Sequence, residues 1–273
     1  MNKIIILLST YNGEKYLNQQ LDSIFSQTYK NFEIIARDDG SQDKTVKILH
    51  SYNITIIDSK NNLGAKDSFE FLLDYAIQNS NSDYFMFCDQ DDIWLPNKIE
   101  SSLAEIKELE KVYGKEFPLL VFTDMKVVDK DLKVENDSFW KHQKLNPNIS
   151  NDWQKLLAQN VITGCTMIFN RASAQISLPF SLHDMLHDHW IGVNVSKYGK
   201  VVHLDIPTVL YRQHGNNVEG AHRYGWVYVA HKLNNLGLPI KKLYRYANYF
   251  EVSFVKLLFY KLIINLKRLF GVS

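Results

Sequence analysis

The stretch YFMFCDQDDIWLP, residues 84–96, joins a continuous apolar run to three carboxylates, Asp89, Asp91 and Asp92. A run that is apolar on both faces is typical of a strand in a parallel sheet that helices cover on both sides. Carboxylates this close together repel one another, and each costs free energy if it is partly buried without a partner. A bound divalent cation would make the cluster tolerable, and a solvated acidic turn is the alternative.

Apolar runs of strand length recur along the first half of the chain and alternate with amphipathic stretches of helix length. We expect strands at 3–9, 32–38, 54–58, 84–89 and 118–124. This alternation predicts an α/β fold with a doubly wound, mostly parallel sheet. After Ile206 the alternation stops and helical patterns continue, which predicts a C-terminal helical extension.

Polar residues stand where several of these strands end, notably Ser9 and Thr10, Asp38 and Asp39, and Asp89. In open α/β sheets, ligands bind beyond the carboxyl ends of the strands. These residues come from distant segments, and we therefore expect them to line one site.

The segments after the first two strands offer groups for a nucleotide. Neither GxGxxG nor GxxxxGK[ST] occurs, so the usual dinucleotide and P-loop devices are absent. Thr10 and Asn12 can form hydrogen bonds, and Tyr11 offers a stacking face. A carboxylate of the Asp38–Asp39 pair can accept the imide N–H of a pyrimidine. The alternative for both segments is an ordinary turn with a helix cap.

Two further loops complete the expected site. Asn62 and Gly64 follow the third strand, where the backbone can approach a ribose or phosphate closely. Asp89 and Asp91 are two residues apart, so they face the same way on an extended segment. Mg²⁺ and Mn²⁺ commonly bind one or two carboxylates and take further oxygen ligands from water and substrate phosphates. Asp92 would point elsewhere, as a possible cap of the next helix.

Taken together, these motifs resemble the family 2 glycosyltransferases of GT-A fold. The matching segments are STYNGEKYL (9–17), DDGSQDKT (38–45), NNLG (61–64) and DQDDIW (89–94). The CDQDDIW form resembles the bacterial rhamnosyltransferase-like branch. Similar segments follow downstream as VITGCTMIFNR (161–171), LHDHW (186–190) and YRQHGNN (211–217).

The resemblance implies nucleotide contacts near the first strands. Thr10 and Asp39 would contact the base, with Asp39 accepting from the pyrimidine imide. Tyr11, Asn62 and Gly64 would lie near the nucleoside.

The resemblance also implies a metal and a base. Asp91 would bind the Mg²⁺ or Mn²⁺ ion that bridges the diphosphate, and Asp89 would reach the ribose or the metal. Asp188 would be the catalytic base, and His214 a metal or phosphate ligand.

The segment around the implied base departs from the family pattern, because His187 stands where the family has Glu. Asp184 lies one helical turn before Asp188 and is a rival base, but Trp190 follows Asp188 as in the family. His183 and His187 are four apart, a spacing that raises zinc as an alternative, although no HExxH motif is present.

These features predict an inverting glycosyltransferase. It would move a sugar from dTDP-rhamnose or a UDP-sugar to a hydroxyl of a growing surface polysaccharide or lipid-linked glycan, without a nucleic-acid partner. Two alternatives stay open: a metal-dependent sugar-nucleotide nucleotidyltransferase, and a non-catalytic module that binds nucleotide sugars or glycans.

Charge is unevenly distributed along the chain. Residues 220–273 carry nine Lys/Arg and one acidic residue, whereas the first 219 residues carry 22 Lys/Arg and 29 Asp/Glu. On a helical wheel over 239–270, a broad apolar stripe lies opposite a basic face, which predicts a helix lying on an anionic membrane surface. Packing on its own domain, or on a second subunit in a homodimer, is the alternative.

The sequence also suggests where the protein works and how it is divided. Cys88 and Cys165 end apolar runs and read as reduced core residues, and no signal peptide is evident at the N-terminus. We therefore expect a cytoplasmic protein at the inner face of the cell membrane. Residues 1–219 would form the GT-A domain, with a nucleotide-sugar half (1–124) and an acceptor and catalytic half (125–219), followed by a basic amphipathic tail (220–273).

Overall fold

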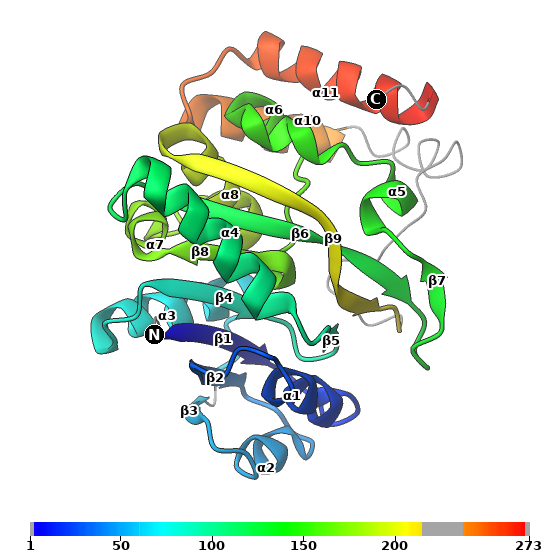
Figure 1. Ribbon diagram of the computed structural model, residues 1–273. Helices are drawn as coiled ribbons and strands as arrows, with labels where there is room; N and C mark the ends of the chain where they lie inside the picture. Colours follow the sequence, from blue (N-terminus) through cyan, green and yellow to red (C-terminus); the bar gives the residue numbers. More distant parts are fainter. Residues whose placement is uncertain (1–2, 60, 215–236, 271–273) are drawn as a thin grey trace.

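A computed structural model describes residues 3–59, 61–214 and 237–270. The described strands form one mixed sheet with helices on both faces, which confirms the predicted α/β fold (Figure 1). The first part of the predicted tail, 220–236, and the end of the YRQHGNN segment lie outside the described residues.

The N-terminal half of the sheet is parallel. Its strands are β1 (Ile4–Thr10), β2 (Phe32–Asp39), β3 (Thr55–Ser59) and β4 (Tyr84–Cys88). They lie in the order β3-β2-β1-β4, and every neighbouring pair is parallel. The connections contain α1 (Leu17–Phe25), α2 (Thr45–Leu49) and α3 (Ala65–Asn79). Because the four strands run in one direction, their carboxyl ends meet at one edge, as expected.

The other half of the sheet is mixed. Its strands are β5 (Ile93–Trp94), β6 (Leu119–Val128), β7 (Val134–Asn136), β8 (Met167–Asn170) and β9 (Lys200–Arg212). β8 is antiparallel to both β4 and β6, whereas β6 and β9 run parallel. The full path is β3-β2-β1-β4-β8-β6-β9-β5, with β7 paired to β6. Insertion of the reversed strand β8 thus limits the continuous parallel sheet to its first four strands.

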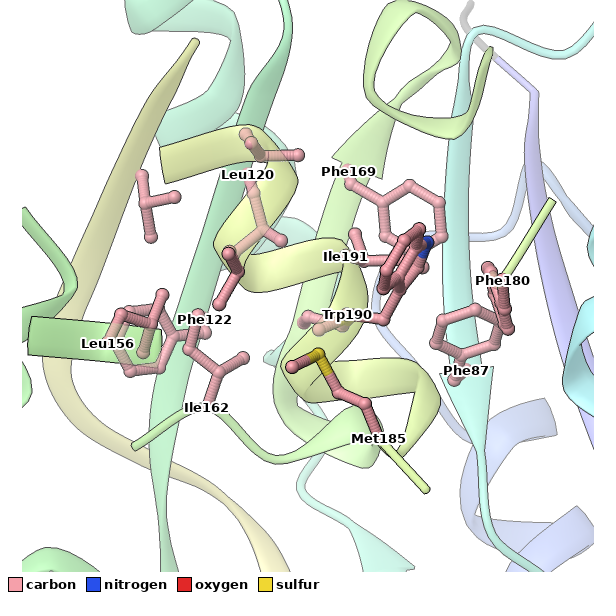
Figure 2. Close-up of a cluster of buried hydrophobic side chains, with 14 of the residues drawn as sticks. Phe87, Leu120, Phe122, Leu156, Ile162, Phe169, Phe180, Met185, Trp190 and Ile191 are labelled. Atoms are coloured by element: carbon pink, nitrogen blue, oxygen red, sulfur yellow. The ribbon is translucent and has the colours of Figure 1, made fainter. Parts of the chain in front are cut away.

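Alternate residues of each central strand enter two separate cores, because successive side chains point to opposite faces of a sheet. The remaining helices are α4 (Lys98–Tyr113), α5 (Phe139–Gln143), α6 (Trp153–Ala158), α7 (Arg171–Ser177) and α8 (His187–Tyr198). Ile5 and Leu7 belong to the core beneath α3, α6, α7 and α8, and Ile4 and Ile6 to the core beneath α1 and α4. Figure 2 shows the first core around Phe122. This double burial explains why the central strand segments are apolar on both faces over most of their length.

The C-terminal region differs from the prediction in two ways. β9 continues to Arg212, six residues beyond Ile206, where the alternation was expected to stop. The expected helix over 239–270 is divided into α10 (Gly237–Tyr249) and α11 (Phe254–Phe270). Glu251, between the two helices, has a φ of 54°, a left-handed conformation that an α-helix cannot continue through.

Helix α11 packs against α6 and α10 along one edge of the molecule (Figure 1). Its inner face places Leu257 and Arg268 in buried positions, with Tyr260 and Ile264 packed against the core. Its outer face exposes Val255, Leu258, Phe259, Leu262, Leu266 and Phe270. The helix therefore packs on its own domain, but the apolar stripe predicted from the sequence points away from it. No helix among the described residues has the length and apolarity that a membrane span requires.

Candidate active site

A cavity of about 900 Å³ opens at the carboxyl edge of the parallel strands. One side is built from the loops after β1, β2, β3 and β4, and the other from segment 159–164, the start of α8 and parts of α5, β9 and α11. Predicted site residues that line it are Thr10, Tyr11, Asp39, Asn62, Gly64, Asp89, Asp91 and Asp188. Residues predicted from distant segments are thus brought around one cavity.

The loop after β1 is held by hydrogen bonds to its neighbours. The Thr10 hydroxyl is buried and donates to Oδ1 of Asp38 at 3.0 Å. Tyr11 uses both backbone groups on Gln90: its N–H donates to Oε1 at 2.9 Å, and its C=O accepts from Nε2 at 3.0 Å. The tyrosine ring stays half-exposed at 47%. A base can therefore reach the ring, while the backbone beneath it is fixed to the DQDD loop.

Asn12 has a different place from the one predicted. It is not among the described residues that line the cavity. Its N–H donates to Oγ of Ser41 at 2.8 Å, and its Oδ1 accepts from the N–H of Gln42 at 2.9 Å. Asn12 therefore joins the loops after β1 and β2, with a φ of 48° that asparagine tolerates better than most residues.

Asp39 is buried and its carboxylate is extensively bound. It forms an ion pair with Arg37, and its Oδ2 accepts from the N–H groups of Leu63 and Gly64 at 3.0 and 2.8 Å. Its neighbour Asp38 accepts from the N–H groups of the following turn and has a structural role. Asp39 thus faces the cavity while it fixes the loop that carries Gly64.

Arg37 is a site residue that sequence reasoning missed. Its guanidinium is buried and donates to Asp39, to Oγ of Ser68 at 3.2 Å and to the C=O of Asn61 at 3.1 Å. Burial lowers the pKa of Arg37. A charged residue within a buried strand was the available signal, because such a charge requires a partner.

Gly64 allows the loop after β3 to turn at the cavity wall. Its φ is 78°, in the left-handed region that favours glycine. Its N–H is close to Oδ1 of Asn62 at 2.9 Å as well as to Asp39. The loop therefore has a fixed shape before any ligand is present.

His214 contacts Asp91, although 123 residues separate them, but it is not among the described residues that line the cavity. The Nε2 atom of His214 lies 2.8 Å from Oδ2 of Asp91, and both side chains are largely buried. The imidazole also packs against the Tyr16 ring at a tilt of 32°, with the ring centroids 4.9 Å apart. The contact holds Asp91 against a histidine, and the role of both residues at a metal or diphosphate centre stays a prediction.

The pKa of the Asp89 carboxyl group is strongly raised. Burial and, second, the nearby charge of Asp91 raise the pKa of Asp89 to about 7. Two carboxylates in a poorly solvated place oppose ionisation unless a cation compensates them. The pair supplies oxygen ligands, which suit Mg²⁺ or Mn²⁺, and His214 lies beside Asp91. The residues present therefore fit a divalent cation.

Asp92 does not cap α4, which begins after Asn97. It is fully buried, and its Oδ1 accepts from the N–H of Arg212 at 3.1 Å. Ligand atoms of Asp89, Asp92 and Cys165 lie within 4.8 Å of one another. However, burial raises the pKa of the Cys165 thiol, and a protonated thiol is a poor ligand for hard cations. We therefore favour Asp89 and Asp91 over this buried trio.

Arg212, another residue missed from the sequence, holds the DQDD loop in place. Its Nε donates to the C=O of Asp91 at 2.8 Å, and its two terminal nitrogens donate to the C=O of Lys130 and to Oε1 of Gln19. The guanidinium lies over the Tyr16 ring, 4.4 Å from its centroid. The end of β9, which was expected to be helical, thus positions the acidic loop.

The first turn of α8 presents Asp188 to the cavity. Asp188 is 8% exposed, and its Oδ1 accepts from the N–H of His189 at 2.5 Å. The rival Asp184 lies outside the cavity lining and forms an ion pair with Arg245 of α10 at 2.5 Å. The geometry therefore favours Asp188 over Asp184 as the base.

The histidines of this segment do not form a zinc site. His183 precedes α8, so the helical spacing assumed for His183 and His187 does not exist. His189 points to the C=O of Leu156 at 2.8 Å. The group of three potential ligands found within 4.8 Å of one another among the described residues consists of Asp89, Asp92 and Cys165, and contains none of these histidines.

His187 lines the cavity next to Asp188. Its ring is enclosed by Phe69 and Phe87, with centroids 4.3 and 4.9 Å away, and burial lowers its pKa to about 3. A Cβ added at Gly164 would overlap Nε2 of His187. The glycine in segment 161–171 is thus needed to admit a neutral imidazole at the cavity wall.

The known proteins that this chain resembles are glycosyltransferases. The sequence matches the model of glycosyl transferase family 2 over residues 5–176. An uncharacterised glycosyltransferase of Rickettsia typhi is 32% identical over 169 residues, which cover 60% of this chain and 49% of that protein. The dTDP-rhamnosyl transferase RfbG of Shigella flexneri is 27% identical over 254 residues, which cover 87% and 81%. The chain thus spans about half the length of the first relative and most of the second.

Solved structures share the fold. TarS of S. aureus, residues 1–349, in complex with UDP-GlcNAc has a TM-score of 0.55 at 19% identity, over 79% of this chain and 60% of that one. The mannosyltransferase PcManGT from Pyrobaculum calidifontis, in complex with GDP-Man and Mn²⁺, has a TM-score of 0.55 at 12% identity, over 96% and 73%. At such identities the likeness concerns the arrangement of strands and helices.

Proposed function

The chain belongs to glycosyl transferase family 2 and has the GT-A fold, and we propose that it is a metal-dependent, inverting glycosyltransferase. One observation carries this proposal: Asp39, Asp91 and Asp188, from three distant segments, line a single cavity. That arrangement lets one nucleoside-diphosphate sugar contact a base-binding carboxylate and a metal-binding carboxylate while its sugar faces a third.

The donor is proposed to lie along the parallel strands, in the half formed by residues 1–124. Its base would stack on Tyr11 and donate to Asp39, and its ribose would lie near Asn62 and Gly64. Asp89 and Asp91, with His214, would hold Mg²⁺ or Mn²⁺, which neutralises charge that develops on the leaving diphosphate. TarS and PcManGT, in complex with UDP-GlcNAc and with GDP-Man and Mn²⁺, support this assignment by analogy of fold.

Asp188 is the proposed general base, and residues 125–219 the acceptor and catalytic half. The carboxylate would take the proton of the acceptor hydroxyl as the oxygen attacks the anomeric carbon, a contribution of about 10²–10⁴-fold. Attack opposite the leaving diphosphate inverts the configuration at that carbon. His187 is neutral at physiological pH, so it adds no charge beside the base.

The donor sugar and the acceptor are finer proposals. Similarity to RfbG over most of both chains favours dTDP-rhamnose, and a UDP-sugar is the second candidate. We propose that the acceptor is a growing surface polysaccharide or a lipid-linked glycan.

We also propose that α11 attaches the protein to an anionic membrane surface, the inner face of the cell membrane. The exposed face of Val255, Leu258, Phe259, Leu262, Leu266 and Phe270 is apolar, and Lys256 and Lys267 stand exposed on the same helix. An apolar helix face flanked by lysines binds anionic lipid by burying area and by charge attraction. A second copy of the chain is the other possible occupant.

A binding panel tests the central proposal. We expect UDP or dTDP to raise the melting temperature more than ADP or GDP, and Mn²⁺ to increase that rise. Incubation with dTDP-rhamnose or UDP-sugars and glycan acceptors should release a nucleoside diphosphate. Release of pyrophosphate instead would indicate a nucleotidyltransferase, and stabilisation by purine nucleotides alone would contradict the assignment of the donor site.

A further inference from the structure

The tail helix forms part of the cavity wall. Arg268, in the last turn of α11, lines the cavity beside Gln143, Leu145, Gln159 and Asn160. Only 7% of this arginine is exposed. It belongs to a segment about 90 residues beyond the part of the chain that matches the family model. Arg268 therefore lies outside the matched part of the chain, whereas the four residues beside it lie within that part.

Two cations of α11 converge at this wall. Lys261 Nζ and Arg268 Nη1 donate to the same oxygen, Oε1 of Gln159, at 3.0 and 3.2 Å. Arg268 Nη2 also donates to the C=O of Gln143 at 2.7 Å. The two residues are seven apart, which places them on the same face of a helix. Both charges are thus directed toward the cavity wall and meet at a neutral amide.

The distribution of charge around the cavity is uneven. Among its described lining residues, Arg268 is the one Lys or Arg side chain, whereas Asp39, Asp89, Asp91 and Asp188 are acidic. The carboxylates lie at the ends of the parallel strands and at the start of α8. The positive charge lies next to α5 and α6, on the same side as the start of α8 and across from the strand ends where the donor diphosphate is proposed to bind.

We propose that this wall binds a phosphate group of the acceptor, with Arg268 and Lys261 as its ligands. The inference rests on the proposed function, because it places the acceptor in the cavity that Asp188 lines. A guanidinium presents two parallel donors that match phosphate oxygens, and a lysine supplies a point charge beside them. The phosphate would take the place of the Gln159 amide oxygen and bring an acceptor hydroxyl toward Asp188.

The opposite face of the same helix supports a phosphate that comes from a lipid. Arg268 faces the cavity, while Leu262, Leu266 and Phe270 face outward. If the outer face of α11 rests on lipid, the helix itself lies near the level of the lipid headgroups. The long side chain of Arg268, on the inner face, would then be close enough to meet a headgroup phosphate that enters the cavity. A soluble sugar phosphate has the same recognition chemistry, so the experiment must distinguish the two sources.

The test compares Arg268→Gln and Lys261→Gln with Lys267→Gln, a matched control on the exposed side of α11. The soluble probe is glycerol 3-phosphate, with glycerol as the uncharged control, titrated by calorimetry with and without UDP and Mn²⁺. The lipid probe is a vesicle containing phosphatidic acid, compared with pure phosphatidylcholine. We expect Arg268→Gln to weaken binding of one probe about tenfold or more, Lys261→Gln several-fold, and Lys267→Gln to leave glycerol phosphate binding unchanged.

The outcomes separate the possibilities. If neither probe binds in an Arg268-dependent way, Arg268 only fastens α11 to the domain and the inference is wrong. Competition between glycerol phosphate and UDP would place the phosphate in the donor site and also overturn it. Should Arg268→Gln fail to fold, as judged by circular dichroism, Lys261→Gln decides the question. If the parent protein binds no UDP but still binds phosphate in an Arg268-dependent way, the proposed function is wrong and the phosphate site stands.

Discussion

His214 Nε2 lies 2.8 Å from Oδ2 of Asp91, and this contact joins the end of β9 to the loop after β4. The imidazole is fixed from its other side by Tyr16. The contact places an imidazole nitrogen beside Asp91, in the proposed metal site of Asp89 and Asp91. We therefore expect these three residues to respond to a metal ion as a unit.

Replacing either partner of this contact should reduce the effect of Mn²⁺ on nucleotide binding. In Asp91→Asn, Mn²⁺ should no longer increase the thermal stabilisation produced by UDP or dTDP, because an amide is a weaker ligand than a carboxylate. His214→Ala should reduce the effect of Mn²⁺ less. An unchanged Mn²⁺ effect in Asp91→Asn would show that the ion binds elsewhere, with the buried Asp92 as the next residue to replace.

Asp188→Asn should separate binding from chemistry. We expect nucleotide binding in the presence of Mn²⁺ to stay within about twofold of the parent, and transfer to fall about 10²–10⁴-fold, because the amide cannot accept a proton. Asp184→Asn is the matched control, since Asp184 is bound to Arg245 outside the cavity. A variant that transfers sugar normally without the Asp188 carboxylate would exclude it as the base.

Metal binding should strengthen as the pH rises through about 7. The pKa of Asp89 is raised from 3.8 to about 7, so between these values the folded state binds a proton that the unfolded state has released. Rising pH therefore destabilises the metal-free protein over that window, and a cation that requires the ionised carboxylate offsets the loss. Melting temperatures with Mn²⁺ and with a chelator should diverge between pH 5.5 and 8, and parallel curves would contradict this.

Gly164→Ala should reveal the crowding around His187. The added methyl overlaps Nε2 of the imidazole, so we expect a loss of about 1–3 kcal/mol in the free energy of unfolding. In the double variant with His187→Ala the overlap is gone, and the cost of Gly164→Ala should largely disappear. Additive effects in chemical denaturation would mean that the backbone, and not His187, resists the methyl.

The outward face of α11 should bind lipid without stabilising the fold. Leu262→Ser and Phe259→Ser change exposed side chains and should alter the free energy of unfolding by no more than about 0.5 kcal/mol. Both should weaken sedimentation with anionic vesicles. Leu257→Ala, on the buried face of the same helix, should instead cost about 2–5 kcal/mol. If the serine variants convert a dimer to a monomer and vesicle binding is unaffected, the face belongs to a second subunit.

The strands and most site residues were predictable because each leaves a local signal. A strand buried on both faces is apolar throughout, and a polar residue at its end stands out, as Thr10, Asp39 and Asp89 do. Arg37 stands out as a charge within an apolar strand, but the sequence does not show what it holds, and Arg212 gave no such signal, because the roles of both depend on partners from other segments. Sequence alone does not say which backbone carbonyls a buried guanidinium will meet.

The hydrophobic periodicity of the C-terminal tail does not determine which face of α11 packs on the domain. The helical wheel separates apolar from basic residues correctly, but it does not say which side packs on the domain. Packing through the apolar stripe would have been the usual result for a soluble helix. Instead, Leu257 and Arg268 face inward, because this edge of the domain offers both a core cluster and polar acceptors at Gln143 and Gln159.

The side chain of Gln90 binds both backbone groups of Tyr11, in the manner of a neighbouring strand. These two hydrogen bonds join Tyr11, on which a base would stack, to the loop that carries Asp89 and Asp91. A change in the position of one loop is therefore felt by the other. If this link couples the proposed base and cation sites, thermodynamic reciprocity requires that the base tighten cation binding by the same factor by which the cation tightens the base, even though the two ligands need never touch.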